Sequence, residues 1–238
     1  MNTLYLVMPA YNEAENIRKV IADWYPVLEE ASEDSRLVIA DSGSTDDTHA
    51  ILRELQASEY PKLEILEDTI KYHGPKVIAL YDYAIKQGAD YIFQTDSDGQ
   101  TDPAEFSDFW KDREKFDAIF GNRTVRGDGQ SRAFVEGVVC FLLRLYFGVK
   151  VPDANAPFRL MKTETVAKYL YKLPADYDLP NIMMVAYMKK FNENVDFREI
   201  SFKPRLAGEN SINIPSIVKH GMNALRDFHR LKKEIYND

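Results

Sequence analysis

The sequence predicts an α/β fold: an open, mostly parallel sheet with flanking helices. Two observations carry this prediction. Short apolar runs of strand length alternate with segments of helical periodicity through the first half of the chain. Polar and acidic motifs follow three of these runs, at the carboxyl ends of strands, where open parallel sheets form their ligand sites. The 238 residues are 45% apolar, which is enough for one large domain with a sizeable core.

The predicted elements of the first half follow one another in order. Residues 4–9 (LYLVMP) form a continuous apolar run, typical of a strand buried on both faces. The next helix has apolar side chains at spacings of three and four: Ile17, Val20, Ile21, Trp24 and Leu28. Residues 36–41 (RLVIAD) are the second strand, and the helix after it carries Ile51, Leu52 and Leu55. Residues 63–67 (LEILE) are the third strand.

A helix over residues 74–87 comes next, and we expect it to end at Gly88 because glycine suits the left-handed conformation after a helix. Strands over residues 91–95 (YIFQT) and 117–122 (DAIFGN) follow. Past Gly127 the alternation weakens. Helices are predicted over 134–146, 163–173 and 181–191, then a strand over 195–202. The last helix carries Val218, Met222, Leu225, Phe228, Leu231 and Ile235.

Composition excludes several classes of protein. The single cysteine, Cys140, and four scattered histidines exclude a disulfide scaffold and a zinc module, and they favour a reducing cytoplasm. The first 100 residues carry a charge balance of −11 and the remainder +3, so an acidic first half argues against nucleic acid as a partner. The arginine-richer second half is compatible with a smaller phosphorylated ligand.

No membrane-spanning or targeting segment is predicted. The N-terminal MNTLYLVMPA has no basic region before a long apolar run, so we interpret it as a first strand and not as a signal peptide. The most apolar stretch, residues 133–151, is interrupted by Glu136, Arg144 and Lys150 and falls short of the roughly 20 apolar residues that a spanning helix needs.

The acidic motif DSDGQ, residues 96–100, directly follows a buried strand. A turn at Gly99 would let oxygens of Asp96, Asp98 and Gln100 converge on one hard cation, Mg²⁺ or Mn²⁺. The alternative is a solvated acidic loop in which an aspartate caps the helix that begins near Pro103. The motif alone leaves both interpretations open.

Two further motifs follow the first and second strands. In DSGSTDD, residues 41–47, Thr45 or Asp46 is a helix cap, which leaves Asp41 and Ser42 available to bind a base or sugar. In PAYNE, residues 9–13, the alternative is a plain turn with Tyr11 as a packing residue. Each motif alone is weak, but three at successive strand ends indicate a ligand site.

Together these residues resemble glycosyltransferase family 2, the inverting nucleotide-sugar transferases with the Rossmann-like GT-A fold. The matching segments are LVMPAYNEAENI, VIADSGSTDDT and ADYIFQTDSDGQTDP, in family order across the first 105 residues. FGNR (120–123), PDANAPFRLMK (152–162) and, more weakly, FKPRLAGENSIN (202–213) resemble the branch that transfers sugars to polyprenyl phosphates, including dolichyl-phosphate mannose synthases and related glucosyltransferases.

The resemblance implies roles for particular residues. The implied nucleotide-binding set is Pro9, Ala10, Tyr11, Glu13, Asp41, Ser42, Asp96, Ser97, Arg132 and Arg205, with Asp41 on the base. The implied ligands of Mg²⁺ or Mn²⁺ are Asp96, Asp98 and Gln100. The implied catalytic set is Asp98, Arg123, Arg159 and Asp153. Arg123, Arg132 and Arg205 would face acceptor or diphosphate oxygens, and Arg159 matches the arginine of the family's SGFR-like segment. His73, Gly74 and Lys76 lie where the family has a glycine-lysine loop, although a surface turn also explains them.

The chain departs from the pattern at Asn155-Ala156-Pro157, where that branch has Thr-Ser-Gly, and at Ser42, where a second aspartate is frequent. A hydroxyl acceptor needs a general base, whereas an acceptor phosphate is already ionised. No clear ED pair lies between Arg123 and Arg159, and Asp153 is equally explained as a base or as a cap. This absence favours a phosphate nucleophile.

We therefore expect one domain, with a donor half over residues 1–122 and an acceptor half over 123–238. A polyprenyl phosphate acceptor would require peripheral contact with the inner face of the cell membrane, for which the amphipathic segment 215–238 is suited; that segment could equally pack on the core. Two alternatives stay open: transfer to a saccharide hydroxyl in cell-envelope polysaccharide synthesis, and a non-catalytic nucleotide-sugar-binding protein. A sugar-1-phosphate nucleotidyltransferase would carry a glycine-rich arginine loop, which PAYNE lacks.

Overall fold

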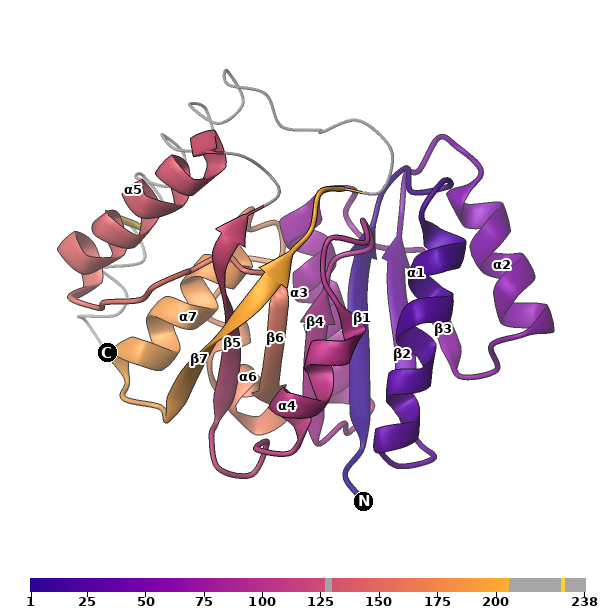
Figure 1. Ribbon diagram of the computed structural model, residues 1–238, viewed down its shortest axis with the longest axis horizontal. Coiled ribbons are helices and arrows are strands. Elements are labelled where there is room, and N and C mark those ends of the chain that lie inside the picture. The colour runs from indigo at the N-terminus through magenta and orange to yellow at the C-terminus, as the bar shows by residue number, and fades with distance from the viewer. Residues whose placement is uncertain (127–129, 206–227, 230–238) are drawn as a thin grey trace.

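The computed structural model describes residues 1–126, 130–205 and 228–229 (Figure 1). Within these residues one sheet has the strand order β3-β2-β1-β4-β6-β5-β7. Its strands are β1 (Leu4–Ala10), β2 (Arg36–Asp41), β3 (Leu63–Leu66), β4 (Tyr91–Thr95), β5 (Ala118–Arg126), β6 (Phe158–Lys162) and β7 (Val195–Phe202). Only β6 runs against its neighbours, β4 and β5, so the predicted α/β fold with a mostly parallel sheet is confirmed.

Helices cover both faces of the sheet. They are α1 (Ile17–Trp24), α2 (Thr48–Ser58), α3 (His73–Lys86), α4 (Phe106–Trp110), α5 (Gln130–Phe147), α6 (Thr163–Leu170) and α7 (Pro180–Lys190), with 3₁₀ turns η1 (Tyr25–Glu30) and η2 (Pro103–Glu105). Successive side chains of a strand point to opposite faces. In β1, Leu4 and Leu6 accordingly join the core under α1, α2 and α4, whereas Tyr5 and Val7 join the core under α3, α6 and α7. Figure 1 shows α1 and α4 in front of the strands and α3 behind them.

Most predicted elements are present, with shifted ends. The helix predicted over 74–87 is α3, and Gly88 after it has a φ of +75°, as expected. The first predicted helix ends earlier than the spacing suggests: α1 stops at Trp24 and the chain continues as η1, which contains Pro26. Proline has no backbone N–H to continue an α-helix. Leu28 is buried all the same, from the 3₁₀ turn.

Strand β6 is absent from the sequence-based prediction. Its five residues, FRLMK, contain a charged side chain at the second position, so they show neither a clean apolar run nor an alternation. The strand inserts antiparallel between β4 and β5 and pairs Arg159 with Gln94 on one side and with Phe120 on the other. Through this insertion, part of the predicted acceptor half lies in the middle of the sheet.

The predicted helix over 215–238 lies outside the described residues, apart from Phe228 and His229. Phe228 is fully buried, with ring centroids 5.6 Å from Phe147 and 6.3 Å from Tyr146. None of the helices in the described ranges is long and apolar enough to cross a bilayer, as predicted.

Candidate active site

The three strand-end motifs meet at one edge of the sheet. There β1 lies between β2 and β4, and Ala10 is the register partner of Asp41. Hydrogen bonds fasten the loops that follow: Ser97 Oγ donates to the Pro9 carbonyl at 2.8 Å, and the Asn12 backbone N–H donates to Ser44 Oγ at 3.0 Å. The turns that follow β1, β2 and β4 therefore form one connected set.

Buried acidic side chains crowd this edge. The side chains of Asp98, Glu13 and Asp96 are only 15%, 7% and 27% exposed. Burial, followed by the negative charge of Asp96, raises the pKa of Asp98 to about 7. Burial also raises the pKa of Glu13, against hydrogen bonds from Asn16 and Arg205. The protein holds these carboxyl groups where their ionised forms need a compensating cation.

Two basic side chains already face the acidic cluster. Arg205, just past β7, pairs with Glu13 through one nitrogen and places Nη1 3.8 Å from Asp98 Oδ2. His73 Nε2 lies 3.3 Å from Asp96 Oδ1. Desolvation opposes the charged form of this imidazole, but the hydrogen bond and charge of Asp96 outweigh it, so the pKa of His73 is raised. The acidic segment 96–100 contains no basic residue, and the positive charge near it comes from Arg205, which follows β7, and from His73 on α3.

The residues fit a divalent cation held by two carboxylates. Among the described residues no three His, Cys, Asp or Glu side chains are arranged to hold a metal by themselves. Mg²⁺, however, is commonly bound by one or two carboxylates together with substrate phosphates, and the partly exposed pair Asp96 and Asp98 supplies that number. The side-chain nitrogen of Gln100 donates to the Lys203 carbonyl at 2.8 Å, so this amide also fastens the segment that carries Arg205.

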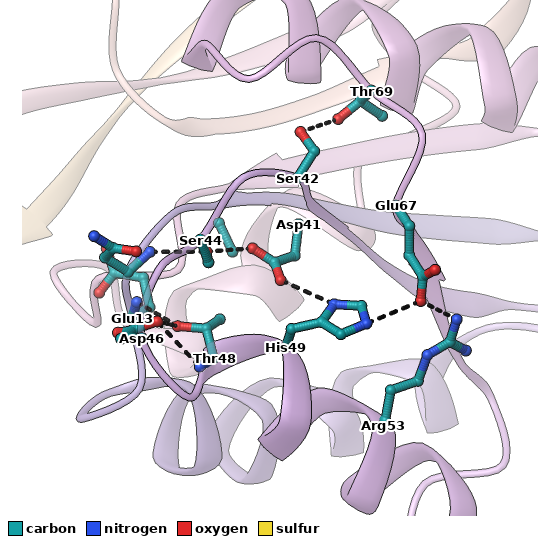
Figure 2. A network of polar contacts seen from close by, with 12 residues as sticks. Glu13, Asp41, Ser42, Ser44, Asp46, Thr48, His49, Arg53, Glu67 and Thr69 are labelled. Atoms are coloured by element: carbon teal, nitrogen blue, oxygen red, sulfur yellow. Dashed lines mark hydrogen bonds and ion pairs between the residues drawn. The ribbon is translucent and has the colours of Figure 1, made fainter.

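Asp41 lies in a separate polar network beside this cluster (Figure 2). Its carboxylate is 1% exposed, and both oxygens have partners: Ser44 Oγ donates to Oδ1 at 2.5 Å, and His49 Nδ1 lies 3.2 Å from Oδ2. On the far side of the ring, His49 Nε2 lies 3.1 Å from Glu67 Oε1. Ser42 Oγ shares a 2.7 Å hydrogen bond with Thr69 Oγ1.

Two lysines flank Tyr11, a partly exposed residue of the PAYNE turn. Lys71 Nζ and Lys76 Nζ lie 5.0 Å and 5.4 Å from the centre of its ring, within the range of cation–π attraction. Lys76 is 1% exposed and donates to the Ala10 carbonyl at 2.5 Å, and burial lowers its pKa to about 8. Lys76 therefore belongs to α3 and not to a surface turn, and its ammonium group lies at the end of β1.

Across the sheet, Arg123 joins two carboxylates in a buried ion-pair network. Its Nε and Nη2 donate to the two oxygens of Asp153 at 2.7 and 2.9 Å, and Nη2 lies 3.4 Å from Glu136. All three side chains are at most 12% exposed. Despite burial, Arg123 holds the pKa of Asp153 below its ordinary value, whereas burial and the charge of Asp153 raise the pKa of Glu136.

Arg159 is fully buried and clamps backbone. Its guanidinium donates to the carbonyl oxygens of Ala156, Asn181 and Ala154 at 2.8, 2.7 and 2.6 Å. Arg159 is 1% exposed, and its hydrogen bonds to these carbonyl groups hold the 154–156 loop in place. Arg132 belongs to α5, but its side chain lies outside the part of the structure that is described.

The glycosyl transferase family 2 model matches residues 5–170, more than two thirds of the chain. The chain belongs to glycosyl transferase family 2. The predicted family and the GT-A-like α/β fold are thereby confirmed.

Two curated relatives are similar over about two thirds of this chain. A polyprenol monophosphomannose synthase of Mycolicibacterium smegmatis is 25% identical over 170 residues, which cover 68% of this chain and 63% of that protein. An undecaprenyl-phosphate mannosyltransferase of Micrococcus luteus is 24% identical over 166 residues, covering 67% and 66%. The chain thus spans slightly less than two thirds of the length of either protein.

A solved structure extends the likeness of fold. Glucosyl-3-phosphoglycerate synthase from Mycobacterium tuberculosis, in complex with Mn²⁺, UDP and glucosyl-3-phosphoglycerate, superposes with a TM-score of 0.68 at 18% identity. The match covers 95% of this chain and 80% of that one.

Sequence reasoning missed four polar residues of this family 2 site: Lys71, His49, Glu67 and Glu136. Glu136 had a signal. A carboxylate inside an otherwise apolar helix indicates a buried partner, whereas the sequence analysis used this residue only to exclude a membrane span. The other three lie on a loop, on α2 and after β3. The fold brings Lys71 to Tyr11 and Glu67 to His49, which in turn contacts Asp41.

Proposed function

We propose that this chain is a metal-dependent, inverting glycosyltransferase that moves a sugar from a UDP-linked donor to an acceptor phosphate. The observation that carries the proposal is the partly exposed acidic pair Asp96 and Asp98 at the end of β4, beside Glu13 and Asp41, in a chain of family 2. The solved relative that contains both Mn²⁺ and UDP supports the choice of cation and nucleotide.

In this proposal the donor binds in the half formed by residues 1–122. Asp41 accepts an N–H of the base, and the turn containing Pro9, Ala10 and Tyr11 lines the nucleotide pocket. Asp96 and Asp98 hold Mg²⁺ or Mn²⁺, which when bound supplies a Lewis acid for the negative charge of the departing diphosphate. Arg205, now paired with Glu13 and near Asp98, exchanges these partners for diphosphate oxygens.

The acceptor binds in the half formed by residues 123–238, and the ion-pair network supports a nucleophile that needs no base. Asp153 accepts from both Arg123 and the Asn155 backbone N–H, and its pKa is lowered, so this carboxylate is poorly placed to take a proton. We assign Asp153 to orienting Arg123, and Arg159 to supporting the 154–156 loop. Arg132 remains a proposed contact for acceptor or diphosphate oxygens.

A screen of candidate sugar donors and acceptors tests this proposed function. Release of nucleoside diphosphate is measured from UDP- and GDP-sugars, with and without Mn²⁺, in the presence of a polyprenyl phosphate or of saccharides. We expect Mn²⁺-dependent UDP release that the polyprenyl phosphate stimulates. Release of pyrophosphate would instead indicate a nucleotidyltransferase. Binding of the donor without turnover would indicate a non-catalytic protein, and stimulation by saccharides alone would indicate a hydroxyl acceptor.

A lipid-linked acceptor is supported by one face of α5. Four large apolar side chains on this helix are exposed at intervals of three or four residues, by 43 to 75%: Phe134, Val138, Phe141 and Leu145. Arg144 is the one ionisable residue whose exposed side chain is described on this helix. A helix face of this composition suits the interface of a bilayer, where the arginine reaches the lipid headgroups.

We expect the protein to sediment with vesicles that contain anionic phospholipid, and Phe141→Asp to weaken this partitioning about tenfold. Removing one phenylalanine from the interface costs about 1.5–3 kcal/mol. Tyr171→Asp is the matched control, because Tyr171 is 62% exposed but lies outside α5. If the unmodified protein stays in the supernatant with anionic vesicles, peripheral attachment is contradicted.

A further inference from the structure

His49, in the first turn of α2, forms a bridge between two carboxylates that come from different strands (Figure 2). Nδ1 lies 3.2 Å from Oδ2 of the buried Asp41 at the end of β2, and Nε2 lies 3.1 Å from Oε1 of Glu67, which follows β3. Arg53, one helical turn further along α2, pairs with the same oxygen of Glu67. The exposed fraction of the imidazole is 44%, so protons reach it from solvent.

This bridge satisfies both carboxylates only when the ring is protonated. The imidazolium has two N–H donors, whereas the neutral ring has one donor and one acceptor, and an acceptor nitrogen facing a carboxylate oxygen is repelled. Histidine is the side chain whose ordinary charge change falls between pH 5 and 8. The charged groups that face the ring are Asp41, Glu67 and, through Glu67, Arg53.

The position of the bridge connects it to ligand recognition. The side chain of Asp41 is 1% exposed, and the buried ammonium of Lys76 lies across the strand end within range of its charge. Because Asp41 is already withdrawn from solvent, neighbouring groups must offset the cost of its negative charge when a base binds there. A positive ring at 3.2 Å offsets that cost and also fixes the direction of the carboxylate.

We propose that His49 is a positioning residue for nucleobase recognition: its protonated ring, anchored by Glu67, orients Asp41 and strengthens binding of the base as the pH falls. This inference rests on the proposed function, because there Asp41 accepts an N–H of the base. By linkage, the ligand must also favour the protonated ring, so binding near neutral pH takes up protons.

Isothermal titration calorimetry with UDP, and separately with pyrophosphate, both with Mn²⁺, tests the role of His49 between pH 6 and 8. Relative to the unmodified protein, we expect His49→Gln to weaken UDP binding about fivefold at pH 6 and by less at pH 8, with pyrophosphate binding unchanged. His49→Lys, whose charge is fixed, should restore UDP affinity and remove the pH dependence that the imidazole contributes. In turnover, His49→Gln should raise the KM for the donor with kcat within about twofold.

His229→Gln is the matched control, since His229 is an exposed histidine and should leave both titrations unchanged. Asp41→Asn separates this inference from the proposed function. If Asp41→Asn abolishes UDP binding but His49→Gln has the UDP affinity and pH profile of the unmodified protein, the role of His49 is overturned and the function stands. If the unmodified protein binds neither UDP nor GDP with Mn²⁺, the proposed function itself is overturned.

Discussion

Asp98→Asn should abolish Mn²⁺-dependent stabilisation by UDP and lower the rate of sugar transfer by at least about 100-fold. The reason is that a metal ion supplies several kcal/mol to a developing negative charge, and about 1.4 kcal/mol corresponds to a factor of ten. Thermal denaturation with and without Mn²⁺ and UDP measures the first effect, and release of UDP from the donor measures the second.

The same variant should not lose stability when no metal is present. Burial and Asp96 raise the pKa of Asp98 to about 7, so ionisation at this position is unfavourable in the folded protein. With the folded pKa above the unfolded value of about 3.9, the penalty is absent at low pH and grows as the pH rises through the window up to about 7. Asp98→Asn removes this penalty, so its metal-free melting temperature at pH 8 should equal or exceed that of the unmodified protein.

Asp102→Asn is the control in the same loop. Asp102 caps η2 by accepting from the Ala104 N–H and pairs with Lys203, outside the acidic cluster. It should retain the stabilisation by Mn²⁺ and UDP. An Asp98→Asn variant with an unchanged response to Mn²⁺ and UDP would contradict the role assigned to Asp98.

Arg123→Met should cost about 3–5 kcal/mol of unfolding free energy at neutral pH. It removes a positive partner of the buried carboxylates Asp153 and Glu136 and leaves them the backbone N–H donors of Asn155 and Ala154. Removing one partner is the costly way to break a buried ion pair. Urea denaturation measures the loss. Arg18→Met is the matched control: Arg18 and Glu54 form an ion pair with side chains about half exposed, so its removal should change stability by less than about 1 kcal/mol.

The loss of unfolding free energy in Arg123→Met, relative to the unmodified protein, should become smaller as the pH is lowered. In the unmodified protein the pKa of Asp153 is lowered, so the stability that this group contributes is present above the ordinary aspartate pKa and is lost as the pH falls through the folded pKa. Without the Arg123 side chain, burial is opposed only by the backbone N–H groups of residues 123 and 155, so the pKa of Asp153 rises and the variant recovers stability as the carboxyls protonate. A deficit that stays constant from pH 8 to pH 4.5 would contradict the assignment of this network to charge pairing.

The strand ends were predictable from the sequence because their signals are local. The run before Asp41 and the run before Asp96 each show a buried strand directly followed by polar residues, and β2 and β4 are present with those ends. The charge that balances the acidic cluster was not predictable from spacing, because Arg205 lies 192 residues from its partner Glu13. The resemblance pointed to Arg205 as a ligand contact, but only the fold pairs it with Glu13.

Strand β6 was missed in the sequence-based prediction for a different physical reason. A charged residue within a short run argues against a central strand, and Arg159 is tolerated there only because three carbonyl oxygens, two in the preceding loop and one on α7, accept its hydrogen bonds. Those partners become visible only when the chain is folded. The same holds for Arg123, whose partner Asp153 lies 30 residues further along the chain.

Anomalous scattering from Mn²⁺ in crystals grown with Mn²⁺ and UDP is the most direct measurement of the central claim. A single peak within bonding distance of carboxylate oxygens of Asp96 and Asp98 and of the diphosphate is the predicted result. A peak elsewhere, or diphosphate bound with no metal at this loop, would contradict the account.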